Sequence, residues 1–244
     1  PLPVLPQEVI DGLIPQPVSS IVYGTLGGGG HAEVILQRIG ATGTLFGFDR
    51  EPIAVEDTKT RISAENAHLI IANYSDMPEQ LSLFDVTQVD GILLDLGLSS
   101  DQLADRERGF SFHSNGPLDL RFNQMAGEPA AKLVNRLSEK HLADLIYEFG
   151  EERFSRRIAR KIVKLRHANK IETAAQLANI VRPCIPRTKK KSIVPATKTF
   201  QALRIFVNQE ISELIYGLIA AAKVLKKDGS SDAELASCCC CPEL

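Results

Sequence analysis

The fold is decided by Ser20-Ile-Val-Tyr-Gly-Thr-Leu-Gly-Gly-Gly-Gly-His31. A short apolar run opens this stretch, and four consecutive glycines follow directly. Glycine adopts positive φ without penalty and lets the backbone approach a ligand closely. Apolar residues at Val34, Ile35 and Ile39 then have helical spacing, and Gly40 ends the pattern. A strand, a glycine-rich turn and a helix in this order are typical of α/β folds that bind nucleosides or nucleotides.

Three further apolar runs have the character of buried strands, at residues 44–49, 68–73 and 89–95. They are nearly continuous in hydrophobicity, as expected for strands that helices cover on both faces of a parallel sheet. A helix-forming segment at 53–63 separates the first two of these runs. The order of elements predicts an α/β fold with a doubly wound, Rossmann-like sheet.

The chain beyond residue 130 is predicted to be helical and is partly very basic. Its expected helices are 138–149, 151–166, 173–180 with Thr173 as N-cap, and a long helix or helix pair at 199–226. Residues 153–204 carry 15 Lys and Arg against one acid, whereas residues 1–152 carry 10 basic and 23 acidic side chains. Such a segment suggests a nucleic-acid partner, and a solvated helix face is the alternative.

Four polar or aromatic residues follow the predicted strands and are candidates for a binding site. Asp49 lies about 20 residues beyond the glycine turn, where an acid accepts hydrogen bonds from ribose hydroxyls. Asp95 ends the fourth strand and is expected to face the bound ligand, with a loop-bracing role as the alternative. Tyr74 follows the third strand and would flank an adenine ring, or be an ordinary loop tyrosine. His31 has no second ligand at suitable spacing, so a place beside the ligand is favoured over a metal site.

Cysteine spacing and hydropathy exclude several classes of protein. Cys184 stands alone, and Cys238 to Cys241 are consecutive, which fits neither a disulfide framework nor a zinc site. No apolar run approaches the roughly 18 residues that a membrane span requires. The first residues carry neither a basic nor an apolar segment of a secretory signal. A reducing compartment without a membrane partner is therefore expected.

Five motifs in this order resemble the small-subunit rRNA (cytosine-N4)-methyltransferases of the RsmH/MraW type. They are Leu26-Gly-Gly-Gly-Gly-His31, Asp95-Leu-Gly-Leu-Ser-Ser100, Arg108-Gly-Phe-Ser-Phe112, Gly116-Pro-Leu-Asp119 and Thr197-Lys-Thr-Phe-Gln-Ala-Leu-Arg-Ile-Phe-Val-Asn208. The similarity extends from about Val4 to Gly229. Each motif alone is weak, but the combination is specific to this family.

The resemblance implies a class I methyltransferase that uses S-adenosyl-L-methionine to methylate the exocyclic N4 of a cytidine in the decoding region of small-subunit rRNA. Its partner would be that rRNA or the small ribosomal subunit. The cofactor contacts carried over from matching motifs are Gly29, Gly30, His31, Asp49, Tyr74, Asp95 and Gln102. Asp95 would accept a hydrogen bond from the target amino group, with Ser99 or Ser100 positioning the base. No metal is required, because the sulfonium charge is lost in the transfer.

The same comparison divides the chain into domains and shows three departures from the family pattern. Residues 1–103 and 197–229 would bind the cofactor, 104–196 would be a helical RNA-binding insertion, and 230–244 are an atypical tail. Tyr23 replaces an acid usual in the first strand, and Asn115 replaces an Asp. The strand expected after Gly229 is absent, so the outer strands are expected to be missing, as in a truncated or alternatively terminated member.

Two other functions compete with methyl transfer at this point. A catalytically inactive RNA-binding or ribosome-assembly protein is favoured by Tyr23 and by the missing strand. An NAD-dependent oxidoreductase accounts for the glycine turn and Asp49 but leaves the basic segment unexplained. A cytoplasmic location is expected, with the mitochondrial matrix as the alternative, and a homodimer is compatible with the sequence.

Overall fold

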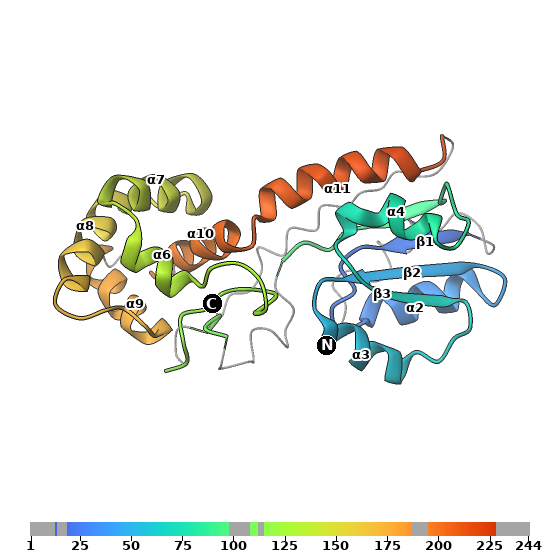
Figure 1. Cartoon of the computed structure of the whole chain (residues 1–244), viewed down its shortest axis with the longest axis horizontal. Coiled ribbons are helices and arrows are strands. Elements are labelled where there is room, and N and C mark those ends of the chain that lie inside the picture. Colours follow the sequence, from blue (N-terminus) through green and yellow to red (C-terminus); the bar gives the residue numbers. More distant parts are fainter. Residues whose placement is uncertain (1–12, 14–18, 98–107, 112–114, 187–194, 228–244) are drawn as a thin grey trace. The chain divides into compact units, whose positions relative to one another are not determined.

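The computed structural model describes residue 13 and residues 19–97, 108–111, 115–186 and 195–227 of the chain (Figure 1). These residues form two compact units. The sheet unit comprises the described parts of residues 1–99 and 212–227. The helical unit comprises the described parts of residues 100–211.

The sheet unit is built on four parallel strands in the order β3-β2-β1-β4. The strands are β1 (Ser20–Tyr23), β2 (Thr44–Asp49), β3 (Ala67–Ile71) and β4 (Gly91–Leu93). Ile21 of the central strand pairs with Leu45 on one side and with Gly91 on the other. The predicted α/β fold is confirmed, although β1, β3 and β4 end before the apolar runs that predict them.

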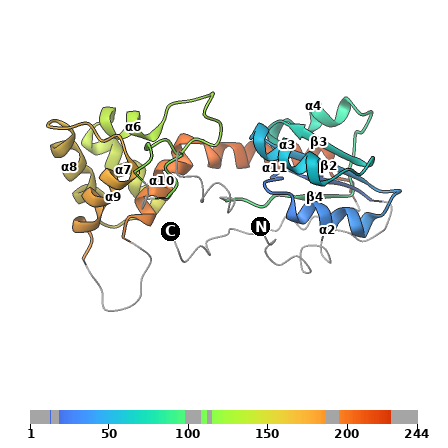
Figure 2. The same ribbon diagram turned by 90° about the horizontal axis from the view of Figure 1, so that it is seen from below.

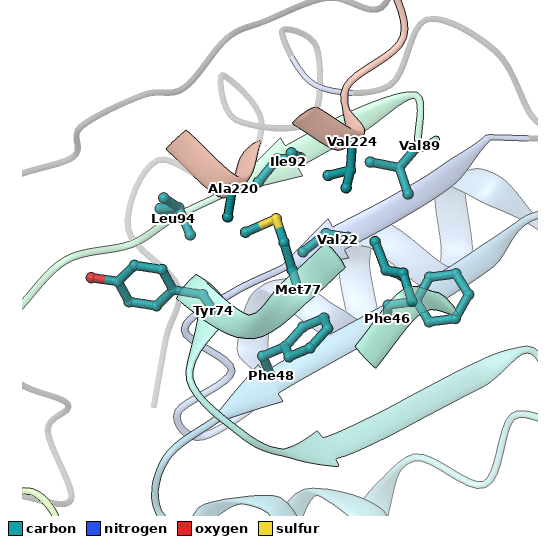
Figure 3. Packing of buried hydrophobic residues seen from close by; sticks show 11 residues of the cluster. Val22, Phe46, Phe48, Tyr74, Met77, Val89, Ile92, Leu94, Ala220 and Val224 are labelled. Atoms are coloured by element: carbon teal, nitrogen blue, oxygen red, sulfur yellow. The ribbon is translucent and has the colours of Figure 1, made fainter. Parts of the chain in front are cut away.

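Helices cover both faces of this sheet (Figure 1). The helices α2 (Gly30–Ile39) and α3 (Pro52–Arg61) pack on the face to which Ile21 and Leu45 point. The helices α4 (Met77–Ser82) and α11 (Glu210–Val224) pack on the opposite face, to which Val22 and Phe46 point. The buried residues on the Ile21 face are called the first cluster, and those on the Val22 face, drawn in Figure 3, the second cluster. Successive residues of a strand point to opposite faces, so a short apolar run supplies two cores.

The residues that follow α11 pair with Val89, which lies two residues before β4; residues 89–93 are called the fourth strand segment below. The Val89 N–H donates to the Val224 carbonyl at 2.7 Å, and the Lys226 N–H donates to the Val89 carbonyl at 3.0 Å. Leu225 thus forms a parallel bridge with Val89. Within the described residues, the outer edge of the fourth strand segment therefore has a neighbour at its start.

The helical unit contains five α-helices within its described residues (Figure 2). They are α6 (Ala130–Arg136), α7 (Glu139–Gly150), α8 (Ser155–Arg166), α9 (Ala174–Val181) and α10 (Thr197–Val207). Thr173 caps α9 in a reciprocal pair with Gln176, as its predicted role requires. The sequence gives no sign of α6, and α8 begins four residues later than expected because Glu151 adopts a left-handed conformation.

The segment 199–226 is a helix pair, and its two helices have different surroundings. Asn208 ends α10, and its side chain donates to the Leu120 carbonyl and accepts from the Phe122 N–H, each at 2.7 Å. Gln209 then has φ 52°, which breaks the helix. The helical unit therefore includes α10, whereas the sequence assigned residues 197–229 to the cofactor domain. The reason is packing: α10 lies against α7, where Gly150 leaves room for the Lys198 backbone.

None of the helices in the described part of the chain has the length and hydropathy needed to cross a membrane.

Candidate active site

The glycine turn lies between β1 and α2 and requires glycine at specific positions. Gly27 and Gly29 have φ 48° and 71°, in the left-handed region that side chains disfavour. Gly29 is the N-cap of α2, and Gly30 is the first helical residue. The first turn of a helix presents backbone N–H groups and the positive end of the helix dipole. This end of α2 is suited to a negatively charged ligand group.

Two side chains of α3 hold the glycine turn from behind. The Thr58 hydroxyl donates to the Gly27 carbonyl at 3.3 Å, and the Arg61 guanidinium donates to the Gly28 carbonyl. A Cβ atom on Gly29 would lie 2.7 Å from Thr58 Cγ2, closer than real contacts allow. Thr58 and Arg61 could not be predicted as part of the site, since no local sequence pattern links α3 to a turn about 30 residues away. The turn is therefore held in place by the protein itself.

Asp49 lies at the end of β2, and its carboxylate accepts hydrogen bonds from the backbone of Gly27, Arg50 and Glu51. Oδ2 accepts from the Gly27 N–H at 2.8 Å, and Oδ1 accepts from the Glu51 N–H at 2.9 Å. Burial raises the pKa of Asp49 above the usual carboxyl value, and these backbone bonds oppose the rise. A carboxylate has about four lone-pair sites, and these backbone bonds do not use all of them. Asp49 is therefore placed beside the turn with acceptor capacity for hydroxyl groups.

Asp95 follows β4 and reaches the same edge of the sheet. Its N–H donates to Thr25 Oγ1 at 2.7 Å, which fixes the backbone next to the glycine turn. The carboxylate is 28% exposed, and Oδ2 lies 3.9 Å from Nδ1 of the buried His31. Burial raises the pKa of Asp95, and the positive charge of a protonated His31 would lower it. A partly exposed carboxylate therefore lies within reach of both a ligand and the turn.

Tyr74 lies beyond β3 and is more enclosed than its predicted role requires. It begins a 3-10 turn (Tyr74–Asp76) and is 7% exposed. The ring lies among the residues of the second cluster (Figure 3), and a Cβ on Gly217 of α11 would overlap it. Beside it, the Asn73 side chain donates to the carboxylate of Glu213, and the Ser75 hydroxyl donates to the same carboxylate at 3.4 Å. No motif in the sequence points to Glu213 as part of this site.

Most predicted site residues lie where parallel strands end, at one edge of the sheet. The described ones are Gly29, Gly30, His31, Asp49, Tyr74 and Asp95. The predicted residues Ser99, Ser100 and Gln102 lie outside the described residues. Among the side chains that the structure describes, no group of three His, Cys, Asp or Glu could hold a metal ion. A helix N-terminus beside two carboxylates can bind a ligand that carries both an acidic group and hydroxyls.

The model of the MraW methylase family matches residues 2–231. The chain is 50% identical over 228 residues to ribosomal RNA small subunit methyltransferase H of Deinococcus radiodurans, covering 93% of this chain and 71% of the relative. It is 47% identical over 230 residues to the protein of the same name from Geobacter sulfurreducens, covering 93% and 74%. A third such relative, from Acidobacterium capsulatum, is 45% identical over 234 residues, covering 93% and 78%.

Proposed function

The chain belongs to the MraW methylase family, a family of S-adenosylmethionine-dependent methyltransferases, and on that premise we propose that it methylates the exocyclic N4 of a cytidine in the decoding region of small-subunit rRNA. The single observation that carries this proposal is the position of the Asp95 side chain. It is a partly exposed carboxylate at the end of β4, beside the glycine turn.

An acceptor such as Asp95 meets the chemical requirement of the reaction. The lone pair of cytosine N4 is delocalised into the ring, so the amino group is a poor nucleophile. A carboxylate that accepts an N–H hydrogen bond from this group opposes the delocalisation and orients the nitrogen for in-line attack. The bound cofactor supplies an electrophilic methyl group on a positively charged sulfur. Asp95 would also stabilise the positive charge that develops on the attacking nitrogen.

The residues of the sheet unit fit this cofactor. The N-terminus of α2 offers N–H groups to the carboxylate of the methionine part. Asp49 offers acceptor capacity to the ribose hydroxyls, because a carboxylate has about four lone-pair sites and its backbone bonds do not use all of them. Tyr74 follows β3, the strand next to β2, where its backbone would border the adenine. Ser99, Ser100 and Gln102 stay predictions from the family motifs.

The helical unit supports an RNA partner through the charge of α8. The exposed cations of this helix include Arg156, Lys161 and Lys164, with Arg160 in an exposed ion pair to Glu139 at 3.3 Å. The opposite face carries Ile158 and Ile162, which are fully buried. Packing thus orients the cationic side chains outward, where they can contact phosphates.

The experiment that tests the proposal replaces Asp95 by Ala and measures transfer of labelled methyl groups to small-subunit rRNA. We expect the variant to lose methyl transfer and to retain most of its RNA affinity. The control is Asp57→Ala, which changes an exposed carboxylate on α3. Turnover by Asp95→Ala at the wild-type rate would refute the assignment.

A second candidate is an RNA-binding protein of the same fold without methyl transfer. It is favoured by Tyr23, which stands in β1 where the family usually has an acid. Calorimetric binding of S-adenosylmethionine together with product formation by the wild type would reject this candidate. A cytoplasmic location and a homodimer stay predictions.

A further inference from the structure

Tyr23, the last residue of β1, is a buried phenol whose hydroxyl reaches the candidate active site. The residue is 3% exposed and belongs to the first hydrophobic cluster, together with Leu26 and Leu93. Its hydroxyl oxygen lies 3.4 Å from Nδ1 of His31, the buried second residue of α2. The two rings meet edge to face, with centroids 5.8 Å apart and an interplanar angle of 83°.

A buried hydroxyl group needs a hydrogen-bond partner, and His31 supplies one. Transfer of a hydroxyl from water into an apolar core costs free energy unless the group is bonded. A phenylalanine would fill the same space among the aliphatic neighbours of Tyr23 without that cost. The hydroxyl therefore has a polar role that ring packing does not explain.

The phenol retains a proton that it can donate in this position. Burial raises the pKa of Tyr23 far above its usual value, the negative charges of Asp95 and Asp49 raise it further, and a hydrogen bond with the Thr25 side chain opposes the rise. The hydroxyl thus keeps its proton at neutral pH. When this hydroxyl donates to Nδ1 of His31, Nδ1 is an acceptor and the ring proton resides on Nε2.

The same Nδ1 atom faces the carboxylate of Asp95, with Oδ2 at 3.9 Å. A proton on Nδ1 would turn His31 into a hydrogen-bond donor toward Asp95, in competition with the amino group of a substrate. We propose that Tyr23 is a positioning residue, which holds Nδ1 of His31 without a proton and so leaves the Asp95 carboxylate available to the target N–H. This inference rests on the proposed function, in which Asp95 is that acceptor.

The first test is Tyr23→Phe, which removes the hydroxyl and keeps the ring. We expect kcat for methyl transfer to small-subunit rRNA to fall about tenfold, the loss typical of one hydrogen bond to a charged or reacting group. The calorimetric Kd for S-adenosylmethionine should change by less than about twofold, as for a residue that contributes only after binding. The matched control is Tyr147→Phe on α7, a hydroxyl deletion at a side chain that is 61% exposed.

The second test reads the imidazole directly and does not depend on turnover. In histidine-selectively ¹⁵N-labelled protein, we expect His31 to carry its proton on Nε2, and we expect Nδ1 to gain proton occupancy in Tyr23→Phe. A proton on Nδ1 in the wild type would overturn the proposal. A wild-type kcat in Tyr23→Phe would overturn it as well, even with the expected tautomer. If the wild type methylates no rRNA but shows the expected tautomer, the proposed function fails and the Tyr23–His31 hydrogen bond stands.

Discussion

The carboxylate of Asp49 holds the backbone of Gly27, whose N–H donates to Oδ2 at 2.8 Å across 22 positions of the sequence. This hydrogen bond joins the end of β2 to the turn that follows β1. Because α3 also holds the turn through Thr58 and Arg61, the glycines are fixed before any ligand arrives. A site that is already ordered loses little conformational entropy on binding.

Substitution of Asp49 by Ala should weaken cofactor binding. The change removes the acceptor for the Gly27 N–H and the acceptors proposed for the ribose hydroxyls. We expect the calorimetric Kd for S-adenosylmethionine to rise at least about tenfold. Asp57→Ala on the exposed side of α3 is the control and should leave the Kd unchanged. Equal Kd values for the two variants would argue against the role of Asp49.

Asp95→Asn should stabilise the folded protein at neutral pH. Burial raises the pKa of Asp95 above 3.8, so its ionisation opposes folding. The contribution of Asp95 to the free energy of unfolding is therefore fully present below the pKa of the unfolded state. It is lost as the pH rises through the pKa of the folded state. Asn does not ionise, so the variant should have the higher Tm at about pH 7.5, and the difference should shrink toward about pH 4.5. A difference that grows on acidification would contradict this sign.

Gly29→Ala should destabilise the protein and weaken cofactor binding. The alanine would have to adopt φ 71°, and its Cβ would lie 2.7 Å from Thr58 Cγ2 and 2.8 Å from Arg61 Nη2. We expect a loss of about 2–4 kcal/mol in the free energy of unfolding, since strain and overlap add. Gly127→Ala is the matched control, with φ 75° and no atom within 4 Å of the new Cβ. Its loss should be about 1 kcal/mol, the strain alone. Similar losses would show that contact with α3 is unimportant.

Gly217→Ala should reverse the usual effect of alanine in a helix. Alanine normally stabilises a helix interior by about 1 kcal/mol relative to glycine. In α11 the added methyl group would overlap the ring of Tyr74, so we expect a net destabilisation of about 1–3 kcal/mol by chemical denaturation. In a Tyr74→Ala background the same substitution should become neutral or stabilising. If Gly217→Ala alone stabilised the protein, the close packing of α11 against the Tyr74 ring would be contradicted.

Arg156→Gln combined with Lys164→Gln should weaken RNA binding through charge. Each phosphate contact that is lost reduces the slope of log affinity against log salt by roughly 0.7–0.9. We expect the double variant to lose about 1–2 from this slope if both cations contact phosphates. Lys59→Gln is the control, because Lys59 pairs with Glu56 on α3 of the sheet unit. An unchanged slope in the double variant would exclude these side chains from the RNA interface.

The strands β1, β2 and β4 were predictable because most of their residues are buried on both faces, whereas β3 is only partly buried. The run 44–49 is apolar from Leu45 to Phe48, and β2 spans the same residues, Thr44–Asp49. The ends were less certain: β4 stops at Leu93 because Asp95 turns its N–H to Thr25. The short helices α4 and α6 were missed, since six or seven residues give too few turns for a helical period to emerge.

The site was predictable where its residues follow strands, and unpredictable where they depend on packing between distant segments. Asp49 and Asp95 follow from their positions after strands, because parallel strands end at one edge. The bonds of Thr58 and Arg61 to the glycine turn, and of Asn73 to Glu213, join residues that no spacing rule connects. The enclosure of Tyr74 by Gly217 depends likewise on how α11 crosses the sheet.

Asp90 has a consequence for the order in which the chain folds. Its carboxylate accepts from the Ser20 N–H at 2.8 Å and from Lys226 Nζ at 2.6 Å, a partner 136 positions later. Closing so long a loop is slow, whereas the described residues of the helical unit end at residue 211, before Lys226 is synthesised. During synthesis the sheet unit therefore begins to emerge first and completes its folding last, because its fourth strand segment also pairs with the residues after α11.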